Sequence, residues 1–289
     1  MDYEGQICRA PMERASFMLP VMVGCSYNQC RFCMLFKHLK YRLLPLEQIE
    51  QELIRVKKIN GNPQRVFLGD GNAFGLETSR LLEILALVHQ YFPQCTEINM
   101  DATVASIEEK SDAQLRQLRQ AGVKRLYLGI ESGLDDVLAF MHKDHTIEQA
   151  YRQIARIQDL GFIYDAHMMT GIAGRGRGQE NAEQIAAFFN RTQPGRIINF
   201  SLFLHRIAPL YRDIQKGTFI PADELENLEE ERLLLKLLEM QHTEYDGFHD
   251  CIEFRVRGTL PQDKLKMLSS LDKAIQQQKE QEPLVAFID

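Results

Sequence analysis

Short apolar segments alternate with longer amphipathic segments along most of the 289-residue chain. Segments such as Val66–Leu68 have the length and the β-branched and aromatic content typical of buried strands. The longer segments repeat apolar residues at spacings of three and four, the period of a helix that buries one face. Strands that alternate with helices predict a parallel sheet built from βα units. The predicted strands are Phe17–Val23, Val66–Leu68, Glu97–Met100, Arg125–Gly129, Tyr164–Met169 and Ile197–Leu204.

Predicted helices fill the intervals between these strands, and two of them have clear end signals. Ser111 is a favoured N-cap residue for a helix over Asp112–Ala121, and Gly122 ends that helix. Gly161 ends the following helix in the same way. Six βα units favour an open six-stranded barrel over a closed eight-stranded one. The predicted helices begin near Pro45, Glu77, Ser111, Thr146 and Gln179.

The pattern changes after the sixth predicted strand. Charged, leucine-rich helices are predicted over Glu224–Gln241 and Asp263–Gln278. The intervening Gly247–Pro261 contains glycine and proline and is predicted as a loop or short strand. We therefore expect an α/β fold: a partial (β/α)6 TIM-like barrel over residues 1–210, and a C-terminal helical cap over residues 211–289. The cap is expected to pack over the open side of the barrel, so that both parts form one structural unit.

Composition and charge exclude several classes of protein. A hydrophobic content of 45% and a charged content of 26% are those of an ordinary globular protein with a sizeable core. The net charge of −6 argues against stable binding of nucleic acid, because phosphate neutralisation requires clustered Lys and Arg. No apolar run approaches the ~18 residues of a membrane span. The polar N-terminus, MDYEGQICRA, lacks the layout of a signal peptide. We expect a cytoplasmic protein that has no membrane partner.

Three of the six cysteines, Cys25, Cys30 and Cys33, lie within nine residues. Such clustering indicates a metal site, because a disulfide framework spreads its cysteines through a short chain. Three thiolates can ligate three irons of a 4Fe–4S cluster and leave the fourth iron open to a ligand. A Cys3His zinc site that uses His38 is an alternative. The other cysteines have no spacing suited to a second cluster.

The segment GCSYNQCRFC resembles the cluster loop of the radical S-adenosylmethionine superfamily, in which an aromatic residue, here Phe32, precedes the third cysteine. Its first spacing is four residues instead of the usual three. A subgroup of the superfamily related to coproporphyrinogen oxidase has a similar sequence motif with this spacing. The resemblance implies a 4Fe–4S cluster on Cys25, Cys30 and Cys33, bound S-adenosylmethionine, and an external electron donor such as flavodoxin or ferredoxin. It also implies reductive cleavage of the cofactor to a radical that abstracts hydrogen from a substrate.

Further motifs at strand ends are similar to cofactor-binding motifs of this superfamily. The turn Gly69-Asp70-Gly71 stands where relatives bind the amino group of the cofactor's methionine, although it also reads as an ordinary turn. The resemblance to the Gly-x-Glu-Ser-Gly motif implies that Glu131 contacts the ribose. Lys143 stands where relatives place a basic residue near the cofactor carboxylate, with a surface lysine as the alternative. Gly171 is implied to pack on the adenine.

Candidates for substrate contact come from the same strand ends and from the tail. The glycine-rich loop after strand five contains Arg175 and Arg177, which suit a phosphate or carboxylate, with a mobile surface loop as the alternative. Asp101 and Asn199 are predicted to face the barrel interior. Candidate catalytic residues are His167, His205 and Cys251, the last as a hydrogen-atom donor or else a half-buried structural thiol. Other polar residues considered near the substrate are Ser201, Tyr245, His249, Asp250, Glu253 and Arg255.

The sequence therefore predicts a radical S-adenosylmethionine enzyme with a small polar substrate, such as a nucleoside or nucleotide. The chain is too short for the large C-terminal domain of the coproporphyrinogen oxidases. Its size and layout are similar to those of the queuosine-salvage lyases, so the most specific hypothesis is a lyase that releases queuine from queuosine or its 5′-phosphate. The alternatives are other radical oxidoreductase or tetrapyrrole-type chemistry, and a non-catalytic metal-binding protein.

Overall fold

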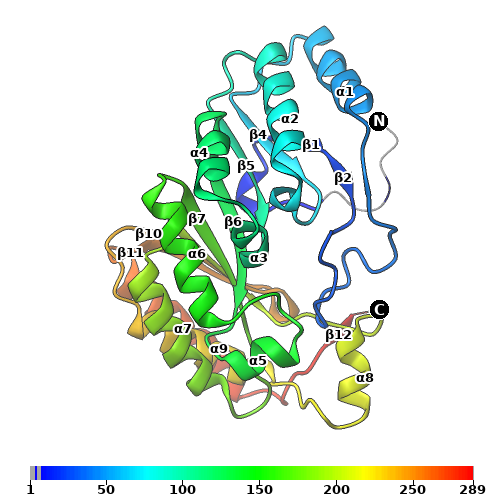
Figure 1. Ribbon diagram of the computed structural model, residues 1–289. Helices are drawn as coiled ribbons and strands as arrows, with labels where there is room; N and C mark the ends of the chain where they lie inside the picture. The colour runs from blue at the N-terminus through cyan, green and yellow to red at the C-terminus, as the bar shows by residue number, and fades with distance from the viewer. Residues whose placement is uncertain (1–3, 5–7, 289) are drawn as a thin grey trace. The chain divides into compact units, whose positions relative to one another are not determined.

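The computed structural model describes residue 4 and residues 8–288 (Figure 1). The sequence analysis predicts that residues 1–10 do not form a signal peptide. Most of these residues lie outside the described part of the chain. In the described part of the chain, no helix combines the length and hydrophobicity needed to cross a membrane.

An eight-stranded sheet organises the chain, with strand order β1-β4-β5-β6-β7-β8-β10-β11. Pairing is parallel from β1 through β6 and from β7 through β10, and antiparallel between β10 and β11. Two further pairs, β2 with β3 and β9 with β12, form small separate sheets. The strands are β1 (Phe17–Pro20), β2 (Met22–Val23), β3 (Arg42–Leu43), β4 (Arg65–Gly69), β5 (Glu97–Ala102), β6 (Val123–Glu131), β7 (Ile163–Thr170), β8 (Arg196–Ser201), β9 (Leu204–His205), β10 (Thr243–His249), β11 (Phe254–Leu260) and β12 (Phe287–Ile288).

Helices connect the parallel strands, as the sequence predicts for βα units. The α-helices are α1 (Leu46–Lys58), α2 (Thr78–Tyr91), α3 (Val104–Glu108), α4 (Asp112–Gln120), α5 (Asp135–Phe140), α6 (Ile147–Asp159), α7 (Gly178–Thr192), α8 (Pro209–Gln215), α9 (Glu224–Leu237) and α10 (Lys264–Lys279). Short 3₁₀ segments are η1 (Pro11–Glu13), η2 (Ala73–Gly75) and η3 (Asp250–Ile252).

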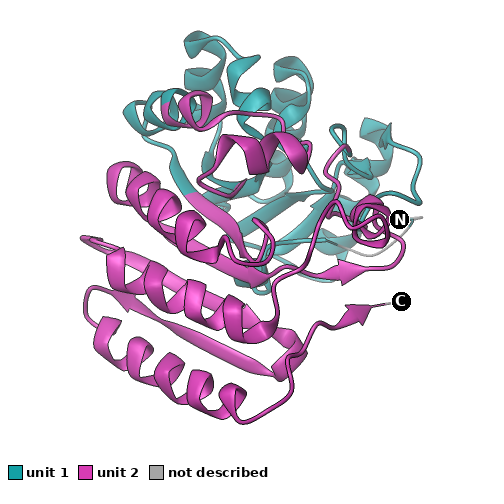
Figure 2. Cartoon of the chain, turned by 90° about the horizontal axis from the view of Figure 1, so that it is seen from below, with its two compact units in different colours: residues 1–28, 35–128, 152–164 teal, residues 29–34, 129–151, 165–289 magenta. Residues whose placement is uncertain are grey.

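The chain forms two compact units, coloured separately in Figure 2. The first comprises residues 1–28, 35–128 and 152–164, and the second comprises residues 29–34, 129–151 and 165–289. Strands β6 and β7 each begin in the first unit and end in the second. The expected division of the chain at residue 210 stays a prediction.

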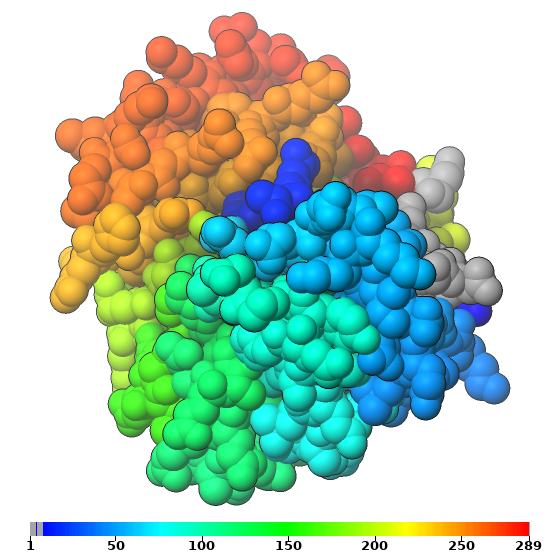
Figure 3. Space-filling view, turned by 90° about the horizontal axis from the view of Figure 1, so that it is seen from above, coloured from blue at the N-terminus to red at the C-terminus, as the bar shows by residue number. Residues whose placement is uncertain are grey.

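In the first unit, the buried strands have the composition that the sequence led us to expect. Val66, Phe67 and Leu68 of β4 are fully buried, because β1 and β5 flank the strand and helices cover it. Helix α1 packs beside α2 at the surface of this unit (Figure 3). The predicted N-cap of α4 is confirmed: Ser111 accepts a hydrogen bond from the Gln114 backbone, and the Gln114 side chain returns one, a capping box.

In the second unit, the tail extends both the sheet and its helices. The predicted tail helices are observed as α9, which packs against α7, and α10, which packs against α9 and β11. For Gly247–Pro261, predicted as a loop or short strand, the strand alternative is confirmed, since the segment contains the end of β10, a short turn and β11. β11 is an edge strand whose arginines Arg255 and Arg257 are exposed, so it lacks the apolar run of a central strand. The α/β prediction is confirmed, and the sheet has two more strands than were counted.

Candidate functional site

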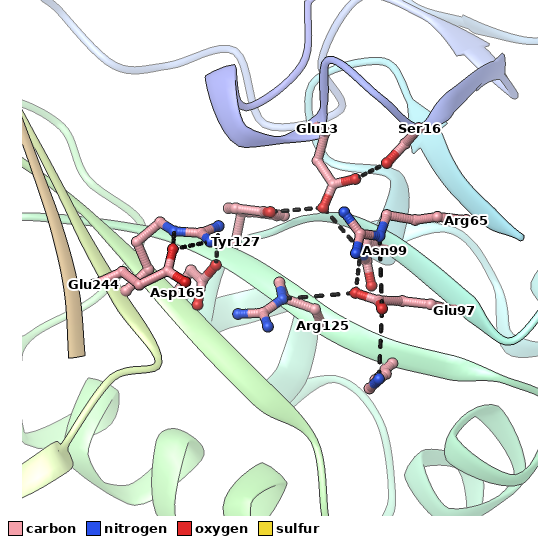
Figure 4. Close-up of polar contacts among 11 residues, drawn as sticks. Glu13, Ser16, Arg65, Glu97, Asn99, Arg125, Tyr127, Asp165 and Glu244 are labelled. Carbon is pink, nitrogen blue, oxygen red and sulfur yellow. Dashed lines mark hydrogen bonds and ion pairs between the residues drawn. The ribbon is translucent and has the colours of Figure 1, made fainter. Parts of the chain in front are cut away.

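The two ends of the parallel strands carry different residues, and the amino ends carry ion pairs. In the first unit, Glu97 lies near Arg65 at 3.6 Å and Arg125 at 3.9 Å (Figure 4). In the second unit, Arg196 at the start of β8 lies 3.3 Å from Asp165. Residues at the amino ends of barrel strands ordinarily serve stability, whereas those at the carboxyl ends serve chemistry. The predicted motifs at Gly69–Gly71, Glu131 and Gly171 stand at the carboxyl ends of β4, β6 and β7.

The first half of the cysteine loop is held by the turn after β4. Gly24 has a φ of +81°, and its backbone N–H donates to Asp70 Oδ2 at 3.4 Å. A Cβ at Gly71 would lie 2.3 Å from the Phe36 ring and 2.9 Å from the Cβ of Cys25, so only glycine fits there. The Gly69-Asp70-Gly71 turn therefore packs directly against Cys25.

Asn72 is a residue of this turn to which the sequence analysis gave no role. Its amide donates to the Ser26 hydroxyl at 3.0 Å and accepts from the backbone N–H of Thr103 at 3.1 Å. It thus links the cysteine loop to the residue that follows β5. Its place beside Asp70 was the signal available in the sequence, but an Asp-Gly-Asn turn is common without such a role.

The second half of the loop belongs to the second unit and packs on an apolar cluster. Phe32 is buried there beside Met141 and Ile172, and Cys30 and Cys33 pack against the same cluster. Arg31 fixes this part of the loop: its backbone N–H donates to the Met141 carbonyl at 3.0 Å. Its guanidinium donates to a carboxylate of α8 at 3.2 Å. Sequence reasoning missed Arg31, because one arginine beside a cysteine carries no spacing signal.

Glu131 and Lys143 form a buried pair at the end of β6. Their side chains are 8% and 6% exposed, and Lys143 Nζ lies 3.4 Å from Glu131 Oε1. The alternative that Lys143 is a surface lysine is therefore wrong. Burial raises the pKa of Glu131, an effect that Lys143 partly offsets. Burial by itself lowers the pKa of Lys143, but the nearby Cys30 and Glu131 outweigh it and raise the pKa above its usual value.

The backbone conformation of Glu131 orients its carboxylate, and one carboxylate oxygen has no hydrogen-bond partner among the described residues. The φ of Glu131 is +66°, a left-handed conformation that is unusual for a residue with a side chain. The oxygen without a partner is the buried Oε2. A Cβ at Gly129 would lie 2.3 Å from Glu131 Oε1 and 3.0 Å from Lys143 Nζ, so a side chain there would displace the pair. An unsatisfied buried oxygen in such a cradle is suited to a hydroxyl donor from a ligand.

Two further candidates are held in their uncharged forms. Burial, reinforced by the charges of Asp70 and Glu13, raises the pKa of Asp101 to about 8. Asp101 is then mostly protonated at neutral pH and can donate a hydrogen bond. Burial, with a smaller effect of Lys143, lowers the pKa of His167 to about 4, so that this imidazole is neutral. His167 packs edge-on against Phe200, with ring centroids 6.1 Å apart.

The glycine-rich loop after β7 begins with a backbone turn that requires glycine. Gly171 has a φ of +78°, and a Cβ there would lie 2.4 Å from Asn227 Oδ1. Its N–H donates to Glu230 Oε2 at 2.8 Å. Ile172, the next residue, is fully buried. Side chains of α9, Asn227 and Glu230, thus contact the first residue of the predicted adenine motif.

The two loop arginines differ in their surroundings. Arg175 is exposed, whereas Arg177 pairs with Asp136 at 2.7 Å and with Glu180 at 2.9 Å. Both arginines line a cavity of about 440 Å³ in the second unit, together with Phe140 and other residues of α5 and the loop before α9. The cavity is large enough for a small polar molecule.

Other predicted residues lie in a buried polar network around α9. Asn199 donates to Glu231 at 2.9 Å and accepts from the Thr170 N–H at 3.1 Å. His249 lies 2.9 Å from Glu231 and 3.0 Å from Glu224, and these carboxylates outweigh burial and raise its pKa to about 9. The remaining members of this network are Ser201, bonded to His249 at 2.7 Å, and Tyr245, bonded to Glu231 at 2.8 Å.

The last candidates lie outside that network. Burial lowers the pKa of His205, which lies on β9. Burial raises the pKa of Cys251, with smaller effects of Glu224 and Asp250, so its thiol is protonated at neutral pH. Asp250 and Glu253 flank the short turn between β10 and β11, and Arg255 pairs with Asp246.

Sequence reasoning missed the buried glutamates of α9. Glu224, Glu230 and Glu231 are at most 5% exposed, although a glutamate-rich helix normally predicts a solvated face. The described residues contain no group of three His, Cys, Asp or Glu side chains gathered as metal ligands. Cys25 belongs to one unit and Cys30 and Cys33 to the other, so the cluster assignment depends on their spacing in the chain and on the family.

Comparisons with known proteins agree with the motifs. The family model of the Radical SAM superfamily matches residues 19–189. The heme chaperone HemW of Bacillus subtilis is 25% identical over 133 residues, which are 45% of this chain and 35% of that protein. The chain thus spans about a third of the length of this relative.

Solved structures with a similar fold are larger than this chain. Coproporphyrinogen III oxidase (HemN) from Escherichia coli matches 76% of this chain and 52% of its own, with a TM-score of 0.62 and 16% identity. Elp3 of the archaeon Methanocaldococcus infernus matches 92% of this chain and 64% of its own, with a TM-score of 0.57 and 13% identity. Methylornithine synthase matches 78% and 63%, with a TM-score of 0.55 and 16% identity. At these identities the likeness shows the fold, a radical SAM α/β partial barrel.

The family model covers more than half of the chain and includes the cysteine loop and the motifs after β4, β6 and β7. The cofactors of this family are a 4Fe–4S cluster and S-adenosylmethionine. The chain belongs to the Radical SAM superfamily.

Proposed function

We propose that the protein holds one 4Fe–4S cluster through Cys25, Cys30 and Cys33, reductively cleaves S-adenosylmethionine, and abstracts hydrogen from a small polar substrate. The observation that carries this proposal is the set of three cysteines within nine residues, which leaves one iron without a protein ligand. When bound, the cluster and cofactor supply a 5′-deoxyadenosyl radical, chemistry that no side chain provides. Electrons come from an external carrier such as flavodoxin or ferredoxin.

The chain's own residues bind and orient the cofactor. Glu131 accepts a ribose hydroxyl through Oε2, the buried oxygen that lacks a partner among the described residues. Lys143 neutralises Glu131 and offers its ammonium to the cofactor carboxylate. Phe32 and the Gly171 turn, which both adjoin the apolar cluster around Ile172, pack against the adenine. Asp70, with Gly69 and Gly71, holds the cysteine loop. Its carboxylate binds the amino group of the cofactor's methionine.

Both neutral and charged groups are available for substrate binding. Protonated Asp101 can donate a hydrogen bond, and His167 is held neutral. Arg175 and Arg177 line the cavity of about 440 Å³ and supply positive charge for an anionic group of the substrate. The two arginines of the second unit favour a small molecule that carries an anionic group, as a nucleotide does.

Release of queuine from queuosine 5′-phosphate is the most specific reaction that we propose. Its support is the pair of loop arginines beside a cavity of suitable size; no relative described above bears this activity in its name. Incubation of the reconstituted enzyme with deuterated nucleosides, tetrapyrroles and amino acids tests the substrate class. Deuterium should enter 5′-deoxyadenosine only with the true substrate. Transfer from a tetrapyrrole and not from a nucleoside would overturn the nucleotide assignment.

A second candidate function is transport of haem without radical catalysis. It is favoured by the similarity to a heme chaperone, which covers 45% of this chain. Titration with haem followed by its absorption spectrum tests it. Tight, stoichiometric haem binding without cleavage of S-adenosylmethionine would favour the second candidate. Tightly bound, colourless zinc after purification would instead favour a Cys3His site.

A further inference from the structure

Glu230, on α9, bonds directly to the loop that carries the predicted adenine contact and, through Asn181 of α7, is linked to the segment that carries the predicted ribose contact. Glu230 is 3% exposed, and its Oε2 accepts the N–H of Gly171 at 2.8 Å. Its Oε1 accepts the side-chain amide of Asn181 at 2.7 Å. Both oxygens of one buried carboxylate are thus bonded to different segments of the second unit.

Asn181 continues the link to the end of β6. Its Oδ1 accepts the hydroxyl of Ser132 at 2.6 Å and the N–H of Gly133 at 3.2 Å. Asn181 and Ser132 are fully buried, so water cannot replace these bonds. Ser132 directly follows Glu131, whose backbone is in the left-handed region. The relay Glu230–Asn181–Ser132 therefore constrains the backbone that aims the Glu131 carboxylate.

Close packing makes the arrangement specific for glutamate at this position. A Cβ at Gly178, the first residue of α7, would lie 3.0 Å from Glu230 Oε2, so the carboxylate occupies the space above the helix N-terminus. The positive end of the α7 dipole favours a carboxylate there. Aspartate would be one methylene too short to reach both the Gly171 N–H and Asn181.

The geometry points to Glu230 as a positioning residue for S-adenosylmethionine: it holds the Gly171 turn and, through Asn181 and Ser132, the Glu131 carboxylate in the orientations that bind the cofactor. This inference rests on the proposed function. It assigns to helix α9, which lies outside the family match at residues 19–189, a role in the cofactor site.

Glu230→Gln tests the inference, because the amide can accept only one of the two hydrogen bonds and turns a donor toward the other donor. We expect about ten-fold weaker binding of S-adenosylmethionine to the reconstituted protein by equilibrium dialysis, with iron content unchanged. Amide hydrogen exchange should quicken in the peptides that contain Gly171 and Ser132. The matched control is Glu229→Gln, which removes a charge from the same helix, where Glu229 pairs with Lys279 at the surface.

A double-mutant cycle separates positioning from a general loss of structure. In a Glu131→Gln background, Glu230→Gln should weaken binding by clearly less than ten-fold, because one of the two groups it positions is already altered and only its bond to the Gly171 turn remains to be lost. Full additivity of the two losses, or unchanged affinity in folded Glu230→Gln, would overturn the inference. If Glu230→Gln does not fold, Ser132→Ala carries the test and should give the same non-additive loss. Absence of cofactor binding in the parent protein would contradict the proposed function instead.

Discussion

The ammonium of Lys143 lies 3.4 Å from the carboxylate of Glu131, and both side chains are more than nine-tenths buried at the end of β6. Burial of two charges is costly unless each has a partner, so this pair is a poor choice for stability alone. Its second carboxylate oxygen has no partner among the described residues. The pair is therefore better explained as a prepared binding group.

Lys143→Met should destabilise the apo-protein by about 3–5 kcal/mol, because Glu131 would remain as an uncompensated buried charge. Denaturant unfolding measures this change. The double variant Lys143→Met/Glu131→Gln should recover most of the loss, since no buried charge remains. Lys124→Met is the control, because the Lys124 side chain, near Glu97, is 41% exposed, whereas that of Lys143 is 6% exposed. A single variant as stable as the parent would show that the pair is not charged in the folded protein.

Replacement of Cys25, Cys30 or Cys33 by Ala should each remove most of the iron and all cleavage of S-adenosylmethionine, because a cluster needs all three thiolates. Cys95→Ala serves as the control: this buried thiol bonds to the Glu97 carbonyl at 3.7 Å and has no proposed role in the cluster. Iron analysis and the absorption spectrum after anaerobic reconstitution provide the measurement. A Cys95 variant as iron-poor as the Cys30 variant would refute the assignment of three ligands.

His249 should make the stability of the protein depend on pH. Its folded-state pKa of about 9 exceeds the ~6.5 of an unfolded histidine, so its stabilising effect is complete below pH ~6.5 and is lost as pH rises through about 9. The free energy of unfolding of the parent should exceed that of His249→Gln by an amount that falls, over this range, by on the order of 3 kcal/mol.

The matched control for this prediction is His242→Gln, because His242 is exposed. Its difference from the parent should not vary with pH. A constant gap between the parent and His249→Gln from pH 6 to pH 9.5 would mean that the Glu224–His249–Glu231 contacts do not hold a proton.

The loop arginines should contribute unequally to substrate binding. Arg177 is already neutralised by Asp136 and Glu180, whereas exposed Arg175 forms no ion pair with the described residues. Arg175→Ala should therefore weaken binding of queuosine 5′-phosphate more than Arg177→Ala. Loss of a charge-assisted contact to phosphate costs about 1.5–3 kcal/mol, or roughly ten-fold or more in affinity. Binding of unphosphorylated queuosine should not change. Arg116→Ala, on exposed α4, is the control, and equal affinity of the parent for both ligands would contradict the phosphate assignment.

Much of the fold was predictable because local patterns agreed with it. The buried run Val66–Leu68, the capping box at Ser111 and the glycine after α4 each specify their element without reference to the rest of the chain. β10 and β11 were not predictable in this way. β11 is the edge strand, where polar residues such as Arg255 face water, and β10 contains buried polar residues such as Asp246 and His249, so neither shows the apolar pattern of a strand.

The residues of the candidate site also divide into those that local motifs predict and those that only the packing reveals. Contiguous motifs, such as the cysteine loop and Glu131-Ser132-Gly133, could be read from spacing. Glu230 could not, because its partners Gly171 and Asn181 are far from it in the sequence and only the packing of α9 brings them together. Its neighbours in the sequence suggested a solvated helix face.

Cleavage of S-adenosylmethionine by the reconstituted protein tests the central claim most directly. The protein is loaded with iron and sulfide without oxygen, reduced with dithionite, and mixed with the cofactor, and 5′-deoxyadenosine and methionine are quantified by mass spectrometry. We predict a brown protein with about four irons per chain that forms both products in equal amounts, and a Cys30→Ala variant that forms neither. A parent protein that binds the cluster and S-adenosylmethionine but forms no more 5′-deoxyadenosine than the Cys30→Ala variant would contradict the account.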